Sequence, residues 1–190
     1  MNAAFYARPV LEVARDLIGC VVAYDGAAGL IVESEAYHDS EPACHAFVGL
    51  TPRTETLFGP PGIAYVYRSY GIHAMLNAVS EPEGVGAAVL IRALEPISGI
   101  ESMAVRRRVQ PSRLRDLCSG PGKLTQALGI GLGLNGSSLL DGPITISDRP
   151  GDRLDPPISV GRRIGITKAV DLPWRFCLTG SRFLSAPVGT

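Results

Sequence analysis

The sequence contains only four cysteines, and no two of them form a C-x-x-C motif. Their wide spacing disfavours both a zinc ribbon and a dithiol redox pair, which need closely spaced thiols. We expect Cys20, Cys44, Cys118 and Cys177 to be reduced thiols, most of them buried.

Long apolar runs are missing as well. No segment approaches the roughly 20 apolar residues that cross a bilayer, and the N-terminus lacks the basic and apolar regions of a secretory signal. Hydrophobic residues make up 46% of the 190-residue chain, which is typical of a globular protein with its own core. We therefore predict a single cytoplasmic domain over residues 1–190, and we expect a monomer without a membrane partner.

The chain also lacks net charge, because 18 basic residues balance 18 acidic ones. This balance counts against a nucleic-acid partner unless the basic residues gather on one face. Only Lys123 and Lys168 are lysines, against 16 arginines, which a G+C-rich coding sequence explains as well as a function does. Arginine is the better phosphate ligand, so residues 106–108 with Arg113 and Arg115 are candidates for phosphate binding. A solvated helix end explains the same cluster equally well.

Apolar periodicity and turn residues predict the first elements. A helix is expected over Pro9–Ile18, and Gly19 ends it. Strands are expected at Cys20–Tyr24 and Leu30–Tyr37, joined by the hairpin signal at residues 25–26. From His38 to Gly62 the pattern indicates one long loop or short helical pieces, and loops of that length are usually functional.

Two further strands, Ile63–Tyr67 and Ile72–Val79, are predicted to pair through residues 68–71, which puts Tyr70 at an exposed hairpin tip. A capping box formed by Ser98 and Glu101 predicts the start of a helix that ends near Val109. The other expected elements are a buried strand at Ala87–Leu94, a helix at Gly122–Leu128 and short strands at Ile144–Ile146, Arg163–Thr167 and Arg175–Thr179.

Glu33 and Glu35 lie two positions apart on a predicted strand, so their carboxylates would share one face at roughly 7 Å. That separation suits the carboxylate pair of an inverting glycoside hydrolase, but one strand rarely supplies both acids, so one of them is expected to be structural. Glu35 is the better general base, because Tyr37 follows it on the same face. The alternative is a surface or salt-bridged glutamate.

His45, with Cys44 beside it and His38 upstream, invites a metal site. The spacing disfavours this, because adjacent Cys and His rarely bind one ion and the P-C-x-x-C part of a nucleobase deaminase motif is absent. A histidine used in packing remains open, and so does a ring stacked on a ligand.

Half of the six tyrosines fall at positions 65, 67 and 70. Tyr65 and Tyr67 share a strand face, so at least one is expected in the core. Tyr70, with Arg68 nearby, suits insertion into nucleic acid, although a ring folded back over the sheet is an equal alternative. Asn77 and Arg92 each end an apolar run, and we interpret them as parts of one site.

Taken together, these segments resemble the alkyladenine (3-methyladenine) DNA glycosylase family over almost the whole chain. The resemblance rests on residues 14–19, 32–37, 51–53, 58–62, 64–71, 76–77, 89–96, 119–124, 163–166 and 173–176. It implies an α+β fold, in which short helices flank a curved, mostly antiparallel sheet with a protruding β-hairpin.

The resemblance also implies roles for individual residues. Glu35 would deprotonate the attacking water, and Arg92 would help to hold that water. Tyr37, Tyr67 and His45 would stack on an extruded base. Asn77 would line the floor of the pocket and disfavour guanine through its 2-amino group.

Tyr70 would fill the gap left in the duplex, and Arg68, Arg53 and Lys123 would contact DNA. No metal and no cofactor is implied. The partner would be double-stranded DNA carrying damaged purines, with a nucleoid location in a prokaryote. Strand nicking needs an amine that forms a Schiff base, and neither lysine lies in the expected pocket segments, so hydrolysis by water is favoured.

The expected enzyme is therefore a monofunctional DNA glycosylase for alkylated or deaminated purines, with 3-methyladenine, 7-methylguanine, hypoxanthine and etheno-adenine as candidate lesions. One alternative is a catalytically inactive module that binds damaged or single-stranded nucleic acid through the same aromatic residues. A nucleosidase that acts on free nucleosides is another.

Overall fold

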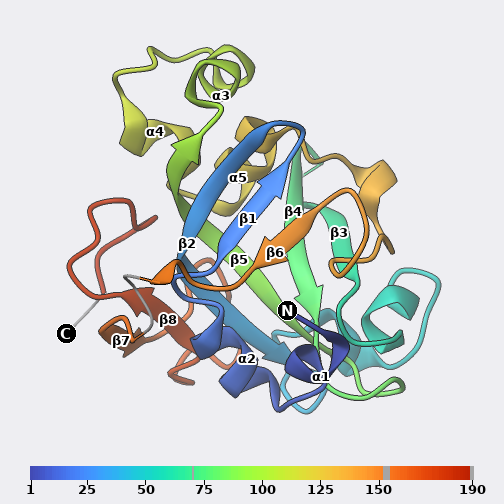
Figure 1. Ribbon diagram of the computed structural model, residues 1–190. Helices are drawn as coiled ribbons and strands as arrows, with labels where there is room; N and C mark the ends of the chain where they lie inside the picture. Colours follow the sequence, from blue (N-terminus) through green and yellow to red (C-terminus); the bar gives the residue numbers. More distant parts are fainter. Residues whose placement is uncertain (70, 152–154, 189–190) are drawn as a thin grey trace.

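The computed structural model describes residues 1–69, 71–151 and 155–188. Eight antiparallel strands form one sheet in the order β3-β4-β5-β2-β1-β6, and β8 joins it by pairing with both β2 and β7 (Figure 1). The strands are β1 (Val21–Tyr24), β2 (Ala27–His38), β3 (Ala64–Ser69), β4 (His73–Val79), β5 (Ala87–Ser98), β6 (Thr145–Ser147), β7 (Ile158–Gly161) and β8 (Arg175–Leu178).

Short helices flank this sheet. They are α1 (Ala3–Tyr6), α2 (Val10–Asp16), α3 (Ile100–Arg107), α4 (Leu114–Cys118) and α5 (Pro121–Leu128), together with the 3-10 turns η1 (His45–Val48), η2 (Glu55–Phe58) and η3 (Leu132–Leu134). The expected α+β class is confirmed, and η1 and η2 are the short helical pieces expected between His38 and Gly62.

The two longest strands, β2 and β5, form the centre of the sheet and are almost entirely buried. Their register shifts near Ala28 and again between Ile31 and Ser34, which marks β-bulges. Bulges increase the local twist and bend of a strand, and the central strands curve visibly in Figure 1. The second bulge falls at Glu33, two residues before the expected catalytic residue Glu35.

Both predicted hairpins are present. Between β1 and β2 the turn residues Asp25 and Gly26 have φ values of 49° and 75°, the left-handed pair that a two-residue hairpin favours. At the other edge of the sheet β3 pairs with β4, from Ala64 opposite Ala78 to Ser69 opposite His73. The expected hairpin tip, Tyr70, lies outside the described residues.

Two sequence predictions were wrong. The capping box does not form, because α3 starts after Gly99, whose φ of 70° suits glycine and whose backbone lies against Ala27, too close for a side chain. The strand expected at Arg163–Thr167 is irregular, because side chains rather than a neighbouring strand bind its backbone. At Ile164 the N–H donates to Glu35 and the carbonyl accepts from Arg92.

The arginine cluster has a structural role in part. Arg106 Nη1 donates to the carbonyls of Ala127 and Leu128 at the end of α5, both at 3.1 Å. Arg107 Nε donates to the carbonyl of Leu117 in α4, at 3.2 Å. Such bonds satisfy carbonyls that have no partner inside their own helix. The two side chains therefore join three short helices, a structural role that neither phosphate binding nor a solvated helix end had predicted.

All four cysteines are free and buried, as expected. Burial raises the pKa of Cys20 and of Cys44 to about 11 and that of Cys118 and of Cys177 to about 12. Their thiols are therefore uncharged at neutral pH. Among the described residues, no helix is long and apolar enough to cross a membrane.

Candidate active site

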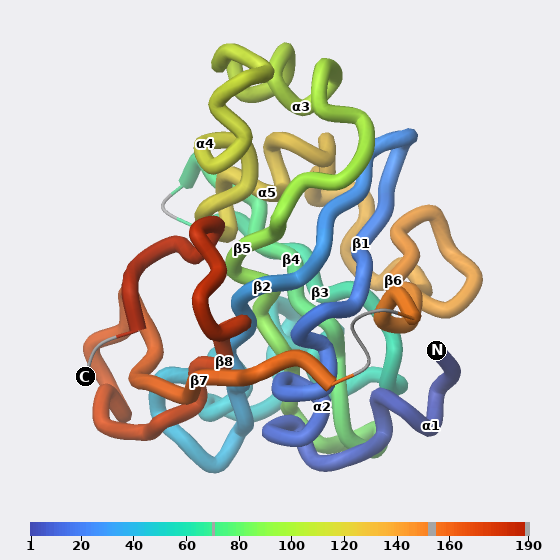
Figure 2. Tube along the Cα trace, turned by 60° about the vertical axis from the view of Figure 1, so that its left-hand side comes forward, coloured from blue at the N-terminus to red at the C-terminus, as the bar shows by residue number. Residues whose placement is uncertain are grey.

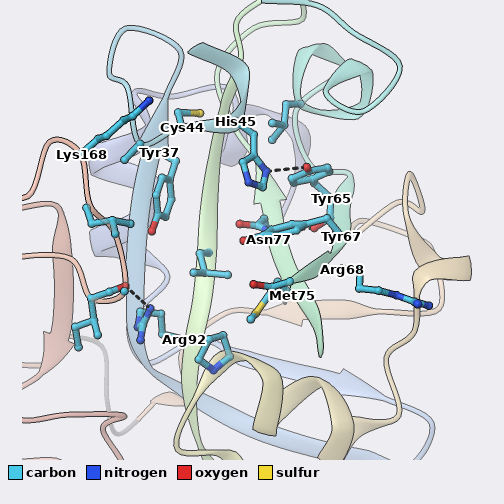
Figure 3. Close-up of a pocket in the computed structure, with 18 of the residues that line it drawn as sticks. Tyr37, Cys44, His45, Tyr65, Tyr67, Arg68, Met75, Asn77, Arg92 and Lys168 are labelled. Atoms are coloured by element: carbon cyan, nitrogen blue, oxygen red, sulfur yellow. Dashed lines mark hydrogen bonds between the residues drawn. The ribbon is translucent and has the colours of Figure 1, made fainter. Parts of the chain in front are cut away.

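A cavity of about 590 Å³ opens between β2, the β3–β4 hairpin and two irregular segments, residues 42–45 and 164–168 (Figure 3). Its volume falls within the range of small-molecule sites. Most of the expected site residues line it, namely Tyr37, His45, Arg53, Tyr67, Arg68, Asn77 and Arg92. Residues that are far apart in the sequence therefore meet at one place.

Strand register brings these side chains together. Tyr65 pairs with Asn77, Asn77 with Leu90, Leu90 with Glu35, and Glu35 with Arg175 on β8. Directly opposite residues on paired strands point to the same face of a sheet. This row therefore crosses five strands on one face. Tyr67, Arg92 and Tyr37 lie two positions further along their strands and share that face.

Aromatic rings form two walls of the cavity. Tyr37 stands on one side, and His45, Tyr65 and Tyr67 stand across the opening from it (Figure 3). Tyr65 and Tyr67 stack with their ring centroids 5.2 Å apart, while His45 meets Tyr67 edge-on at 4.6 Å. The space between the walls suits a flat, aromatic ligand.

The sequence analysis gave Tyr65 no role of its own in the site. Its ring is 3% exposed, as the core prediction requires, yet it also lines the cavity. Its hydroxyl lies 3.1 Å from His45 Nδ1, so it fixes the orientation of that ring. The position of Tyr65 two residues before Tyr67 was the available signal.

His45 is an uncharged wall of the cavity at neutral pH. Burial, and then the positive charge of Arg53, lower its pKa from the ordinary value of 6.5. With its pKa lowered, the imidazole becomes protonated only at a pH below 6.5. A neutral ring accepts a cationic ligand nearby, whereas an imidazolium would repel it.

Asn77 is a buried amide that lines the cavity. Its Nδ2 donates to the carbonyl of Tyr65, 3.0 Å away. This bond fixes the plane of the amide.

Glu35 lies one layer behind the cavity and has an exposed fraction of 0%. Its Oε1 accepts from the Ile164 N–H at 2.7 Å, and its Oε2 accepts from the Tyr37 hydroxyl at 2.9 Å and from Arg92 Nη1 at 3.2 Å. All three donors belong to residues that line the cavity. The carboxylate is thus held against the wall rather than exposed on it.

The environment of Glu35 favours its protonated form. Burial raises the pKa of this carboxyl above its usual 4.5, and the opposing effects of Arg92, the Ile164 N–H and the Tyr37 hydroxyl are smaller. A carboxyl with a raised pKa is a stronger base once it is ionised, which suits proton abstraction near neutral pH.

Glu33 is the structural member of the glutamate pair. Its Oε1 accepts from Arg92 Nε at 3.0 Å and from Arg175 Nε at 2.8 Å. Both oxygens also accept from Ser185, through the backbone N–H at 2.6 Å and the hydroxyl at 2.7 Å. Arg175 in turn donates to the carbonyl of Ala186 at 2.6 Å. The end of the chain therefore folds back onto the residues that hold Arg92 (Figure 2).

The sequence analysis also missed a second buried ion pair. Arg163 and Glu41 contact each other through both guanidinium Nη atoms, and the Arg163 side chain lies against the ring of Tyr37. With these two, the buried charged residues in the described part of the chain are three glutamates, at 33, 35 and 41, and three arginines, at 92, 163 and 175. Their formal charges cancel.

One expectation about lysine was wrong, because Lys168 lines the cavity. It lies on the irregular segment 164–168, one residue after the expected strand at Arg163–Thr167. In Figure 3 it stands at the opposite end of the cavity from Arg92, and its side chain is exposed. Lys123 is not among the lining residues and donates to Ser119 Oγ at 3.3 Å, close to Pro121, which does line the cavity.

Comparison with known proteins decides the family. Residues 4–182 match the family model described as "Methylpurine-DNA glycosylase (MPG)". The chain belongs to the methylpurine-DNA glycosylase family. The expected resemblance is confirmed, and so is the expected enzyme class, since this family consists of N-glycosyl hydrolases.

Relatives in this glycosylase family resemble the chain over nearly its whole length. A protein of Bradyrhizobium diazoefficiens is 56% identical over 187 residues, which cover 98% of this chain and 91% of the relative. One from Rhodopseudomonas palustris is 56% identical over 183 residues, 96% of this chain and 86% of the relative. A third, from Methanoculleus marisnigri, is 50% identical over 190 residues, 97% and 98% of the two chains. Each bears the name "Putative 3-methyladenine DNA glycosylase".

Proposed function

We propose that this protein removes alkylated purines from double-stranded DNA by hydrolysing the N-glycosidic bond with water. The observation that carries the proposal is the pairing of an aromatic-walled cavity with a buried carboxylate directly behind it, in a member of this family. We propose 3-methyladenine as the first substrate, because the relatives are named for it.

The damaged base would stack between Tyr37 on one side and His45 and Tyr67 on the other. Alkylation at a ring nitrogen gives a purine a positive charge, and aromatic faces attract cations by ~0.5–2 kcal/mol. Normal purines lack that charge. A neutral His45, kept so by its lowered pKa, adds to the selection. Asn77, which lines the cavity, would disfavour the 2-amino group of guanine without excluding it, so 7-methylguanine remains a candidate substrate.

The attacking water would occupy the gap bordered by Tyr37, Arg92 and Ile164. Glu35 is hydrogen-bonded to all three, and Arg92 Nη1 also donates to the Ile164 carbonyl at 3.3 Å, so a water there would be within reach of the Glu35 and Ile164 acceptors. As the glycosidic bond breaks, positive charge builds on the sugar. The Glu35 carboxylate stabilises that charge and removes the proton from the water.

DNA would approach the mouth of the cavity. Exposed Arg53 and Arg68 line that mouth, and Lys123 lies next to it, so these cations are positioned to contact phosphates. Turning a nucleotide out of the duplex costs a few kcal/mol. We propose that Tyr70 offsets part of this cost by filling the gap, and that Tyr70→Ala weakens duplex binding and excision.

The test is release of free base from duplexes that carry 3-methyladenine, 7-methylguanine, hypoxanthine or etheno-adenine. Wild-type protein is expected to release at least 3-methyladenine. Glu35→Gln removes the carboxylate that acts as the general base while keeping the size of the side chain. It is expected to lower the rate of base release by about 10²–10⁴-fold. Binding of abasic-site DNA should survive, because the cavity walls and the mouth are unchanged.

The outcomes separate the alternatives. Release of no base, with tight binding of damaged DNA, would indicate an inactive binding module. Turnover of free nucleosides that is insensitive to Tyr70→Ala would indicate a nucleosidase. Full activity of the Glu35→Gln variant would remove Glu35 from the mechanism.

A further inference from the structure

A buried ion pair behind the Tyr37 wall has no part in the hydrolysis proposed above. Arg163 Nη1 lies 2.6 Å from Glu41 Oε1, and Nη2 lies 3.0 Å from Oε2. The two residues are 5% and 4% exposed. A buried pair of this kind carries a large desolvation cost and often adds little to stability, so its presence beside a ligand cavity calls for a functional explanation.

The pair connects three segments that line the cavity. Arg163 Nη1 donates to the carbonyl of Ala36 at 3.0 Å, next to Tyr37 on β2. Its Nη2 donates at 3.4 Å to the carbonyl of Ala169, which follows the segment 164–168. Glu41 Oε2 accepts from the N–H of Ala43 at 2.8 Å, in the segment that leads to His45. A shift of the pair would therefore move both walls.

Arg163 also acts on Tyr37 through its charge. Its guanidinium carbon lies 4.6 Å from the centre of the Tyr37 ring and 5.2 Å from the Trp174 ring. Tyr37 lines the cavity and Arg163 is not among the lining residues, so the guanidinium lies on the side of the ring that is turned away from the ligand. A cation on that face weakens the attraction of the other face for a second cation.

Glu41 cancels this effect. With its carboxylate bound to both Nη atoms, the group behind Tyr37 is a dipole of zero net charge rather than a free cation. We propose that Arg163 and Glu41 are positioning residues that set the preference of the cavity for positively charged over neutral purines. This inference rests on the proposed function, since it assumes that the base stacks on Tyr37.

The test compares binding of two duplexes, one with cationic 7-methylguanine and one with neutral hypoxanthine. Both carry a 2′-fluorinated sugar, so that the glycosidic bond resists cleavage. The measured quantity is the affinity for the 7-methylguanine duplex divided by the affinity for the hypoxanthine duplex. Glu41→Gln keeps the size of the side chain and leaves the charge of Arg163 unbalanced. This ratio should therefore fall about tenfold.

Two further variants separate charge from structure. The double variant Glu41→Gln/Arg163→Gln has no charge behind Tyr37 and should return the ratio to within about threefold of wild type. Arg163→Gln alone should keep the ratio at or above the wild-type value. If thermal denaturation shows that Glu41→Gln is unfolded, the ratio measured for Arg163→Gln tests the inference instead. The exposed Glu101→Gln on α3 is the matched control.

A ratio that Glu41→Gln leaves unchanged would overturn the inference, as would an equal fall in all three variants or a lower ratio in Arg163→Gln alone. The proposed function fails separately, if wild-type protein releases neither base from the unfluorinated duplexes and no 3-methyladenine from a duplex that carries it. Release of base together with an unchanged ratio would reject only the role of the pair.

Discussion

Glu35 combines burial with direct contact to the wall of the cavity. It is fully buried, yet it is hydrogen-bonded to three residues that line the cavity. Burial raises its pKa more than Arg92 lowers it. The raised folded-state pKa means that Glu35 contributes to stability below its unfolded pKa, and that this contribution is lost as the pH rises through the folded pKa. At neutral pH the ionised residue therefore costs stability, and its proposed role as the general base would explain that cost.

The pH dependence of the reaction should report this carboxyl. Only the ionised form abstracts a proton, so the rate should fall as the pH falls through the pKa of Glu35, with a midpoint above the ordinary 4.5. The pKa of His45 is lowered, so His45 should add no step at or above 6.5. Single-turnover rates on a 7-methylguanine duplex measure this, because that leaving group is already cationic. A rate that stays constant down to pH 4.5 would contradict the prediction.

Lys168 allows a direct test of hydrolysis by water. An amine becomes a Schiff-base nucleophile when burial or a neighbouring cation activates it, whereas the Lys168 side chain is exposed to solvent at the cavity mouth. Borohydride reduction during turnover is therefore expected to trap no covalent complex with DNA. A trapped complex that disappears in Lys168→Ala would show that an amine, and not only water, attacks the sugar.

At the scale of elements, the sequence was sufficient for most strands and insufficient for their register. Alternating and apolar runs predicted β2, the β3–β4 hairpin and β5 to within a few residues. The alignment of Tyr65, Asn77, Leu90 and Glu35 across four of these strands could not be predicted, because it depends on the bulges near Glu33 and on pairing over long sequence separations. The resemblance supplied residue roles that periodicity alone did not.

The wrong elements have a common physical cause. Residues 163–167 have a β-like composition, but their backbone bonds to Glu35 and Arg92 instead of to a strand. Likewise, the capping box does not form because the backbone of Gly99 packs against Ala27, where only glycine fits. In both cases a tertiary contact decided the local conformation. Glu41 and Arg163 were missed for the same reason, since 122 positions separate them in the chain.

The C-terminal segment is predicted to support catalysis from outside the family match, which ends at residue 182. Ending the chain after Leu184 removes the bonds that Ser185 donates to Glu33 and the bond that Arg175 donates to the carbonyl of Ala186. Hydrogen bonds to charged groups contribute ~1.5–3 kcal/mol each, so the melting temperature should fall, and the rate should fall with it because Glu33 also holds Arg92.

Milder and control variants test this role of the segment. Ser185→Ala removes only the hydroxyl and should give a smaller loss in both measurements. Thr179→Ala, which removes an exposed hydroxyl bonded to Ser159, is the control and should change neither. Full activity and stability of the shortened chain would show that the segment is dispensable.

For the whole molecule, we propose that the chain is one domain that unfolds in a single transition. One core cluster joins residues from Tyr6 near the N-terminus to Phe176 in β8, and β2 and β5 run through its centre. Thermal unfolding followed by far- and near-ultraviolet circular dichroism should therefore give coincident curves. Two separated transitions would contradict a single domain. The monomeric state expected from the sequence stays a prediction, which sedimentation measures.

The buried thiols have a consequence for a protein that meets methylating electrophiles. Such reagents attack thiolates much faster than thiols, and a raised pKa together with a closed interior leaves each cysteine almost entirely unreactive. A methylating reagent therefore finds few reactive thiols in this protein. The activity proposed above is expected to persist during exposure to such reagents.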